Sequence, residues 1–216
     1  MTPDREQLVA QIAEEVIARL RERVGPPNSF GNGPKAPATD GVFPTVDDAV
    51  AAAREAQARI AVLSIDDLGK AIESIRRICA DRAEELAKME LAETGLGRLD
   101  HKIEKLKLVK NVLGLEAMRS ESRSNPTGVC LIEHAPWGVI GMVLPATHSA
   151  PTLASNAINI LAARNSAIFS PHPAGASVAG TILKLINQEI RRLTGVANAI
   201  VTVEKPSIRT AEEIFR

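Results

Sequence analysis

The chain has few of the residues that mark several large classes of protein function. Its 216 residues include no Tyr, one Trp and two Cys, and aromatic residues make up 2% of the total. So few aromatic rings argue against a surface that stacks the bases of single-stranded nucleic acid. Lys and Arg together number 26, as do Asp and Glu, so no net charge favours DNA, RNA or anionic lipid. We therefore expect a protein that does not bind nucleic acid.

Cysteine and long apolar runs are equally scarce. Cys79 and Cys130 lie far apart and form no CxxC pair, which fits a reducing compartment such as the cytoplasm. No apolar run approaches the roughly 18 residues that cross a bilayer, and the N-terminus lacks the apolar core of a secretory signal. The four His have no metal-ligand spacing, and GxGxxG, GxxxxGK and HExxH motifs are absent. The sequence therefore predicts a cytoplasmic protein with no membrane span and no metal site.

The first part of the chain predicts a tethered helix, residues 1–24, followed by a flexible linker, residues 25–41. Leu8, Ile12, Val16 and Leu20 recur at helical spacing, and the linker is rich in Pro, Gly, Asn and Ser. A lone amphipathic helix cannot bury its apolar stripe by itself. It is expected to dock either on its own protein or on a sister subunit, or in the groove of a partner.

Residues 42–122 predict an almost entirely helical segment. One helix starts near Val46, Ser64 caps the next, another ends at Gly95, and a last one runs from Asp100 to Met118. A run of lysines on the last helix is interpreted as a solvated face, because the apolar residues between them have core spacing. These lysines are Lys102, Lys105, Lys107 and Lys110.

Beyond Thr127 the pattern changes to strands that alternate with helices. A first strand covers residues 128–133, and residues 139–144, 167–169 and 199–203 are short apolar strands that helices separate. This order predicts a parallel sheet with right-handed crossovers, and ligands bind at the carboxyl edge of such sheets. Cys79 falls within a helix and Cys130 within a strand, so both are expected to be buried and inert thiols. Three strands leave the sheet incomplete, so the isolated chain is expected to be marginally stable.

Several segments resemble the N-terminal part of an aldehyde dehydrogenase, most closely the CoA-acylating (propanal-type) enzymes of bacterial microcompartments. They are GVFPTVDDAVAAA (41–53), ETGLG (93–97), APWGVIGMVLPAT (135–147), NSAIFSPHP (165–173) and VTVEKP (201–206). SPHP after a core strand, and PAT where ordinary members carry PWN, favour the acylating branch. The helix of residues 4–24 resembles the encapsulation peptide that docks such enzymes against shell proteins. The expected fold is therefore a Rossmann-type α/β sheet of this family, incomplete here, in residues 42–216.

The resemblance implies that NAD oxidises a small aldehyde bound to a cysteine, and that CoA, a co-substrate, takes the acyl group. It places one set of residues along the nicotinamide, namely Val143, Leu144, Pro145 and Ala146. It places the next turn against the adenosine half, namely Ser170, Pro171, His172 and Pro173. Thr147 aligns with the family's Asn that donates to the oxyanion.

The resemblance also implies what this chain lacks. The family's nucleophilic Cys lies beyond residue 216, so the chain alone is expected to be inactive, and the complete enzyme is expected to form homo-oligomers. Arg164 stands where the family carries Gly, and a positive φ there would strain it by ~1 kcal/mol. Two alternatives remain at this point: an ordinary non-acylating aldehyde dehydrogenase, and a non-catalytic docking module for a microcompartment shell.

Overall fold

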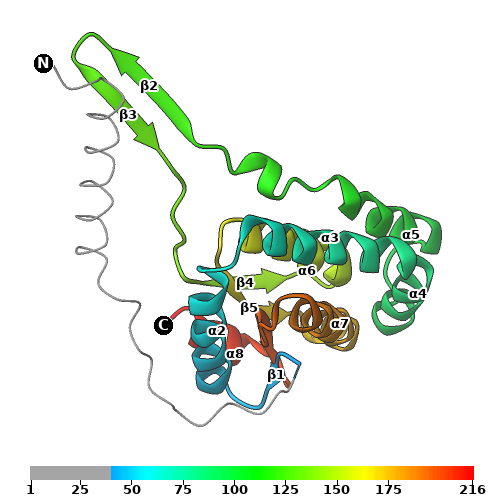
Figure 1. The fold of residues 1–216 in the computed structure, drawn as a ribbon. Helices are drawn as coiled ribbons and strands as arrows, with labels where there is room; N and C mark the ends of the chain where they lie inside the picture. Colours follow the sequence, from blue (N-terminus) through cyan, green and yellow to red (C-terminus); the bar gives the residue numbers. More distant parts are fainter. Residues whose placement is uncertain (1–39) are drawn as a thin grey trace, which may run out of the picture. The chain divides into compact units, whose positions relative to one another are not determined.

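A computed structural model describes residues 40–216, and a parallel sheet lies at the centre of this region (Figure 1). Its strands are β1 (Val42–Phe43), β4 (Val139–Leu144), β5 (Ser166–Pro171) and β6 (Ile200–Val203), in the order β1-β6-β5-β4. The three predicted strands and their parallel pairing are confirmed. The predicted helix of residues 1–24 lies outside the described residues, as does nearly all of the predicted linker.

Helices cover both faces of the sheet. α2 (Val46–Ile60) and α8 (Ile208–Ile214) lie on one face, and α6 (Ser149–Ala162) and α7 (Ala176–Thr194) lie on the other. α3 (Ile65–Asp81) packs over α6 and α7. Successive strand residues point to opposite faces, so Ile168 packs in the cluster around α2 whereas Phe169 packs in the larger cluster. This double cover explains why β5 is buried along its whole length.

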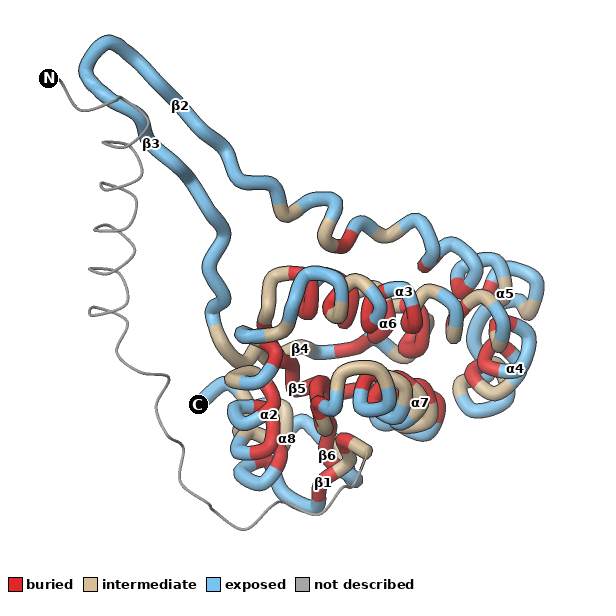
Figure 2. The backbone as a smooth tube through the Cα atoms, viewed as in Figure 1, coloured by how far each residue is buried: buried red, intermediate tan, exposed pale blue. Residues whose placement is uncertain are grey.

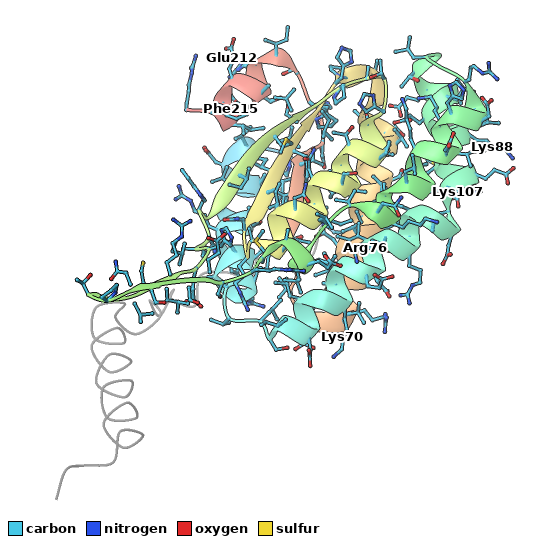
Figure 3. All side chains as sticks on the ribbon, turned by 90° about the horizontal axis from the view of Figure 1, so that it is seen from above. Lys70, Arg76, Lys88, Lys107, Glu212 and Phe215 are labelled. Atoms are coloured by element: carbon cyan, nitrogen blue, oxygen red, sulfur yellow. The ribbon has the colours of Figure 1, made fainter. Side chains whose placement is uncertain are left out.

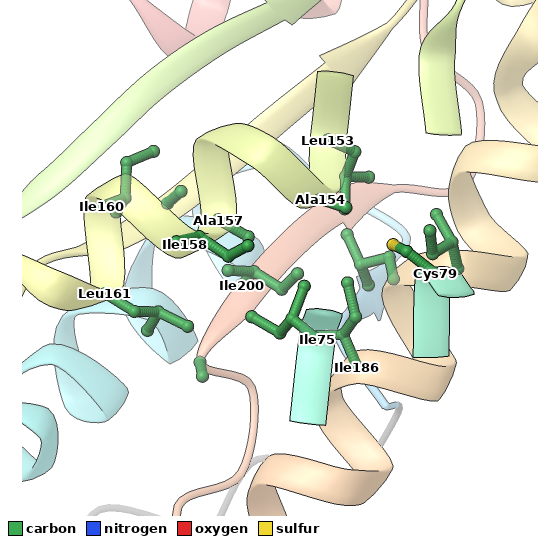
Figure 4. Packing of buried hydrophobic residues seen from close by; sticks show 14 of the residues in the cluster. Ile75, Cys79, Leu153, Ala154, Ala157, Ile158, Ile160, Leu161, Ile186 and Ile200 are labelled. Carbon is green, nitrogen blue, oxygen red and sulfur yellow. The ribbon is translucent and has the colours of Figure 1, made fainter. Parts of the chain in front are cut away.

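The larger cluster joins several helices to the sheet, among them α3, α6 and α7. Figure 4 shows Ile75 and Cys79 of α3, Ile186 of α7 and Ile200 of β6 close to the apolar face of α6. All four side chains are fully buried. α3, α6 and α7 are therefore packed tightly on this face of the sheet.

The helix ends follow the predicted signals. The Ser64 side chain accepts a hydrogen bond from Asp67 N at 3.0 Å and caps α3. α4 (Ala83–Thr94) ends at Gly95, and α7 ends at Gly195, each in the left-handed conformation. The predicted helix from Asp100 to Met118 is wrong in its length, because α5 spans only Leu99–Leu108. Two short 3-10 turns follow it, Val109–Asn111 and Leu115–Ala117.

Residues 121–132 form a separate antiparallel hairpin. β2 (Glu121–Asn125) pairs with β3 (Gly128–Ile132), and every residue of both strands is exposed, as Figure 2 shows. The predicted helical segment up to residue 122 is therefore wrong at its end, and so is the expectation that Cys130 is buried. The apolar content of β3 predicted a strand correctly. It did not predict that Val129 and Leu131 are 78% and 63% exposed.

No helix in residues 40–216 combines the length and the apolar character needed to cross a membrane.

Candidate functional site

The two turns that the sequence predicts as a ligand edge lie side by side at the carboxyl ends of β4 and β5. Leu144 is the register partner of Pro171, and His172 N donates to Leu144 O at 3.0 Å across the end of the pair. Gly175 follows the second turn, and a Cβ built on it would lie 2.5 Å from Ser149 Oγ after the first. The missing side chain of Gly175 thus allows the two turns to touch.

The predicted cofactor residues divide by burial. Val143 is 57% exposed, and Pro145, Thr147, His172 and Pro173 are exposed beside it, with Ala146 half-buried. Leu144, Ser170 and Pro171 have buried side chains. These last three side chains support the edge from beneath. The three residues can therefore contact a ligand only through their backbone atoms. The exposed predicted residues are therefore apolar, apart from the Thr147 hydroxyl and the His172 ring.

Two histidines present defined nitrogen atoms at this edge. His148 Nδ1 lies 2.6 Å from Thr147 Oγ1, so the two side chains share one hydrogen. His172 Nδ1 accepts from Ala174 N at 3.1 Å, so the neutral ring carries its proton on Nε2. His172 therefore offers an exposed N–H donor, and the Thr147 hydroxyl is oriented by the neighbouring ring.

A buried ion pair lies beneath the first turn. Lys102 Nζ of α5 is 2.9 Å from Glu90 Oε2 of α4, and the two side chains are 3% and 1% exposed. Lys102 Nζ also donates to Thr147 O at 3.0 Å, while Ala150 N donates to Glu90 Oε1 at 3.0 Å. Both members of the pair thus bind the backbone of the predicted site.

The solvated-face interpretation of Lys102 is therefore wrong. Lys107 projects outward, as does Lys88 of α4 (Figure 3), and Lys105 and Lys110 are exposed as predicted. Lys102 itself lies four residues before the buried Leu106, on the core face of α5. That spacing was the available signal, but a lysine on a core face is favourable only with an acidic partner that the sequence did not identify.

Glu93, the first residue of ETGLG, caps the helix that follows the second turn. Its two carboxylate oxygens accept from Ser177 N and Val178 N, each at 2.8 Å, in the first turn of α7. The negative charge is favourable at this positive end of the helix. The amides of Ser177 and Val178 are therefore already hydrogen-bonded and do not offer donors to a phosphate. Glu93 also links the ETGLG segment to α7, the helix that follows SPHP.

The opposite, amino end of the sheet carries Arg164. Its φ is 59°, so the strained conformation considered from the sequence is present. Its guanidinium donates to Ala61 O at 3.0 Å and to Leu63 O at 2.7 Å, beyond the end of α2. These charge-assisted bonds offset the backbone strain. A cavity of about 310 Å³ beside Arg164 and His134 lies away from the predicted ligand edge.

Neither cysteine lies at the ligand edge. Cys79 is buried in α3, and burial raises the pKa of its thiol to about 12. Such a thiol stays protonated at neutral pH and is a poor nucleophile, as predicted. Cys130 is exposed on the hairpin. Within residues 40–216, no cluster of His, Cys, Asp or Glu is arranged to hold a metal ion.

A family model described as "Aldehyde dehydrogenase family" matches residues 35–210. The chain belongs to this family. The match includes the sheet, both turns and the Glu90–Lys102 pair. The fold and the family expected from the sequence motifs are therefore confirmed.

Individual aldehyde dehydrogenases extend the comparison. Acetaldehyde dehydrogenase (acetylating) of Salmonella typhimurium is 35% identical over 98% of this chain and 44% of its own length. The structure of Rhodopseudomonas palustris propionaldehyde dehydrogenase with bound CoA and an acylated cysteine matches with a TM-score of 0.78 and 38% identity. That match covers 81% of this chain and 40% of the other.

A third aldehyde dehydrogenase comes from a named compartment. Propionaldehyde dehydrogenase of the Clostridium phytofermentans fucose utilisation bacterial microcompartment matches with a TM-score of 0.77 and 36% identity, over 80% of this chain and 40% of the other. This chain thus spans less than half the length of the relatives that it matches.

Proposed function

We propose that the complete protein containing this chain is an NAD-dependent, CoA-acylating aldehyde dehydrogenase. It would convert an aldehyde, CoA and NAD into an acyl-CoA and NADH. The observation that carries the proposal is the contact of PAT and SPHP at one carboxyl edge, in a chain 35% identical to an acetylating enzyme. In open α/β sheets, this edge is where extended ligands bind.

The residues of the edge fit a dinucleotide in chemical character. Val143 and Pro145 offer exposed apolar surface for a flat ring, and His172 Nε2 offers a donor at the second turn. Leu144, Ser170 and Pro171 would act through their backbone, with Ala146 and Pro173 completing the two turns. When bound, the nicotinamide would accept a hydride, and Val143 and Pro145 would orient its ring.

Thr147 is proposed as a donor to the oxyanion that forms when a thiolate attacks the aldehyde carbon. Its hydroxyl can donate outward only when His148 Nδ1 carries the hydrogen that the two side chains share. A ring protonated on Nδ1 would therefore leave the Thr147 proton free for the oxyanion. The thiolate itself is proposed to come from outside this chain, because Cys79 is buried and Cys130 lies on the hairpin.

An assay with and without CoA tests this reaction. The protein expressed from the complete reading frame should form NADH and acyl-CoA from acetaldehyde or propanal only when CoA is present. Equal NADH formation without CoA, with a carboxylate as product, would support an ordinary aldehyde dehydrogenase instead. The same assay on residues 1–216 should show no turnover.

We further propose that residues 4–24 dock the enzyme on a microcompartment shell protein. The proposal rests on the amphipathic pattern of this segment and on the solved relative from a bacterial microcompartment. Deletion of residues 1–24 should abolish co-purification with shell proteins and leave turnover unchanged. Unchanged co-purification of the deletion variant with shell proteins would favour docking of this helix on the enzyme itself or on a sister subunit of a homo-oligomer.

A further inference from the structure

The buried pair of Glu90 and Lys102 is costly to desolvate, and buried pairs add little net stability in general. Removing two charges from water carries a large desolvation penalty, and apolar residues of similar volume often replace such a pair without loss of stability. Here the two side chains are 1% and 3% exposed. A pair this deeply buried is explained better by what it holds in place than by the stability that it adds.

Each partner makes a further contact with the backbone where the turn after β4 leads into α6. Lys102 Nζ donates to Thr147 O, and Glu90 Oε1 accepts from Ala150 N, both at 3.0 Å. These two backbone groups lie on either side of His148 and Ser149. The pair therefore holds the end of the turn and the start of α6, from two helices that are remote from both in the sequence.

We propose that Glu90 and Lys102 are positioning residues for the reaction, acting through Thr147. This inference rests on the function proposed above. With its carbonyl held inward by Lys102, Thr147 keeps an exposed side chain at the ligand edge, hydrogen-bonded to His148. A shift of this backbone moves the proposed oxyanion donor, and misplacement of a reacting group by about 1 Å costs about a hundredfold in rate.

Two variants separate positioning from stability. Lys102→Met leaves the Glu90 carboxylate buried without its cation, so it lowers the urea midpoint and also removes the donor to Thr147 O. Glu90→Gln combined with Lys102→Met removes both charges, and the glutamine oxygen still accepts from Ala150 N. The double variant should recover much of the stability lost in Lys102→Met. Thr147 O, however, still lacks the hydrogen bond that Lys102 Nζ donates in the wild-type protein.

An exposed pair on α4 gives the matched control. Lys88 Nζ and Glu84 Oε1 are 2.6 Å apart, and their side chains are 59% and 70% exposed. Glu84→Gln with Lys88→Met makes the same two kinds of substitution on α4 without touching the turn. This control should keep the wild-type urea midpoint, amide exchange and turnover.

The experiment measures three quantities on the full-length protein: the urea midpoint, the hydrogen exchange of residues 147–150, and aldehyde-dependent NADH formation. In the double variant we expect exchange in the turn to be about tenfold faster. We expect kcat to fall by about a hundredfold while the midpoint recovers. If hydrogen exchange of residues 147–150 and kcat in the double variant return to wild-type values together with the urea midpoint, the proposal is overturned.

Glu90→Gln alone keeps the proposal testable if the double variant does not fold. This variant retains Lys102 and therefore the bond to Thr147 O, so turn exchange should stay closer to wild type than in Lys102→Met. Equal exchange in the two single variants would overturn the proposal. Absence of NADH formation by the wild-type protein would refute the proposed reaction, while the exchange data would still decide whether the pair holds the turn.

Discussion

The close contact of Gly175 with Ser149 gives a prediction that tests the geometry of the site directly. In Gly175→Ala, the new Cβ would lie 2.5 Å from Ser149 Oγ, which is well inside van der Waals contact. Overpacking of this kind costs about 1–3 kcal/mol. The φ of Gly175 is −138°, so alanine adopts the backbone conformation freely and the cost comes from the contact.

The partner substitution has its own, different cost. Ser149→Ala removes a 2.7 Å hydrogen bond from Ser149 Oγ to Pro145 O, worth about 1 kcal/mol. In the double variant the nearest remaining neighbour is the Cβ of residue 149, at 3.4 Å, which is an ordinary contact. The double variant should therefore lose less stability than the sum of the two single variants, by about 1 kcal/mol or more.

Urea unfolding of the four proteins, followed by circular dichroism, measures this coupling. Gly180→Ala is the control, because it lies in α7, the helix that begins directly after Gly175, and a Cβ there meets nothing within 4 Å. That control should be stabilised by about 0.5–1 kcal/mol. Strictly additive losses, or a Gly175→Ala variant as stable as Gly180→Ala, would refute the contact between the two turns.

Three further predictions concern single residues. Arg164→Ala loses the bonds to the α2 end but keeps the strained φ, so urea unfolding should show it about 1 kcal/mol less stable than Arg164→Gly. At pH 8, iodoacetamide should label the exposed Cys130 quickly and Cys79 only after unfolding, because burial raises the pKa of Cys79 to about 12. Peptide mass spectrometry locates the label. Glu93→Gln leaves one oxygen for two amides and should cost about 1 kcal/mol in urea unfolding.

Each of these predictions has a contradicting result. Equal stability of the Ala and Gly variants at position 164 would mean that the turn does not require a positive φ. Labelling of Cys79 in the native protein at the rate of Cys130 would contradict its burial. An unchanged urea midpoint in Glu93→Gln, with the neighbouring Ala92→Ser as control, would show that the α7 cap adds no stability.

Local signals in the sequence predicted a large part of the fold. Apolar runs predicted β4, β5 and β6, and glycine and serine predicted the helix ends at Ser64, Gly95 and Gly195. These features depend on residues within one element. The two turns of the candidate site were predicted to share an edge because parallel pairing follows from the order of strands and helices along the chain.

The features that the sequence missed depend on distant partners. β1 is two residues long and exists because Val42 pairs with Thr202 of β6. The burial of Lys102 depends on Glu90 in another helix, so the lysine pattern of α5 alone gave the wrong answer. Cys130 lies on an apolar strand, but that strand pairs only with β2 among the described residues and packs on neither face of the sheet.

Hydrogen exchange of the full-length protein with and without NADH tests directly whether the carboxyl edge of β4 and β5 binds the cofactor. We predict slower exchange on NADH binding in residues 143–147 and 170–175, the two turns at the carboxyl edge of β4 and β5. Protection confined to the cavity beside Arg164 and His134, with both turns unchanged, would contradict the assignment of that edge as the cofactor site.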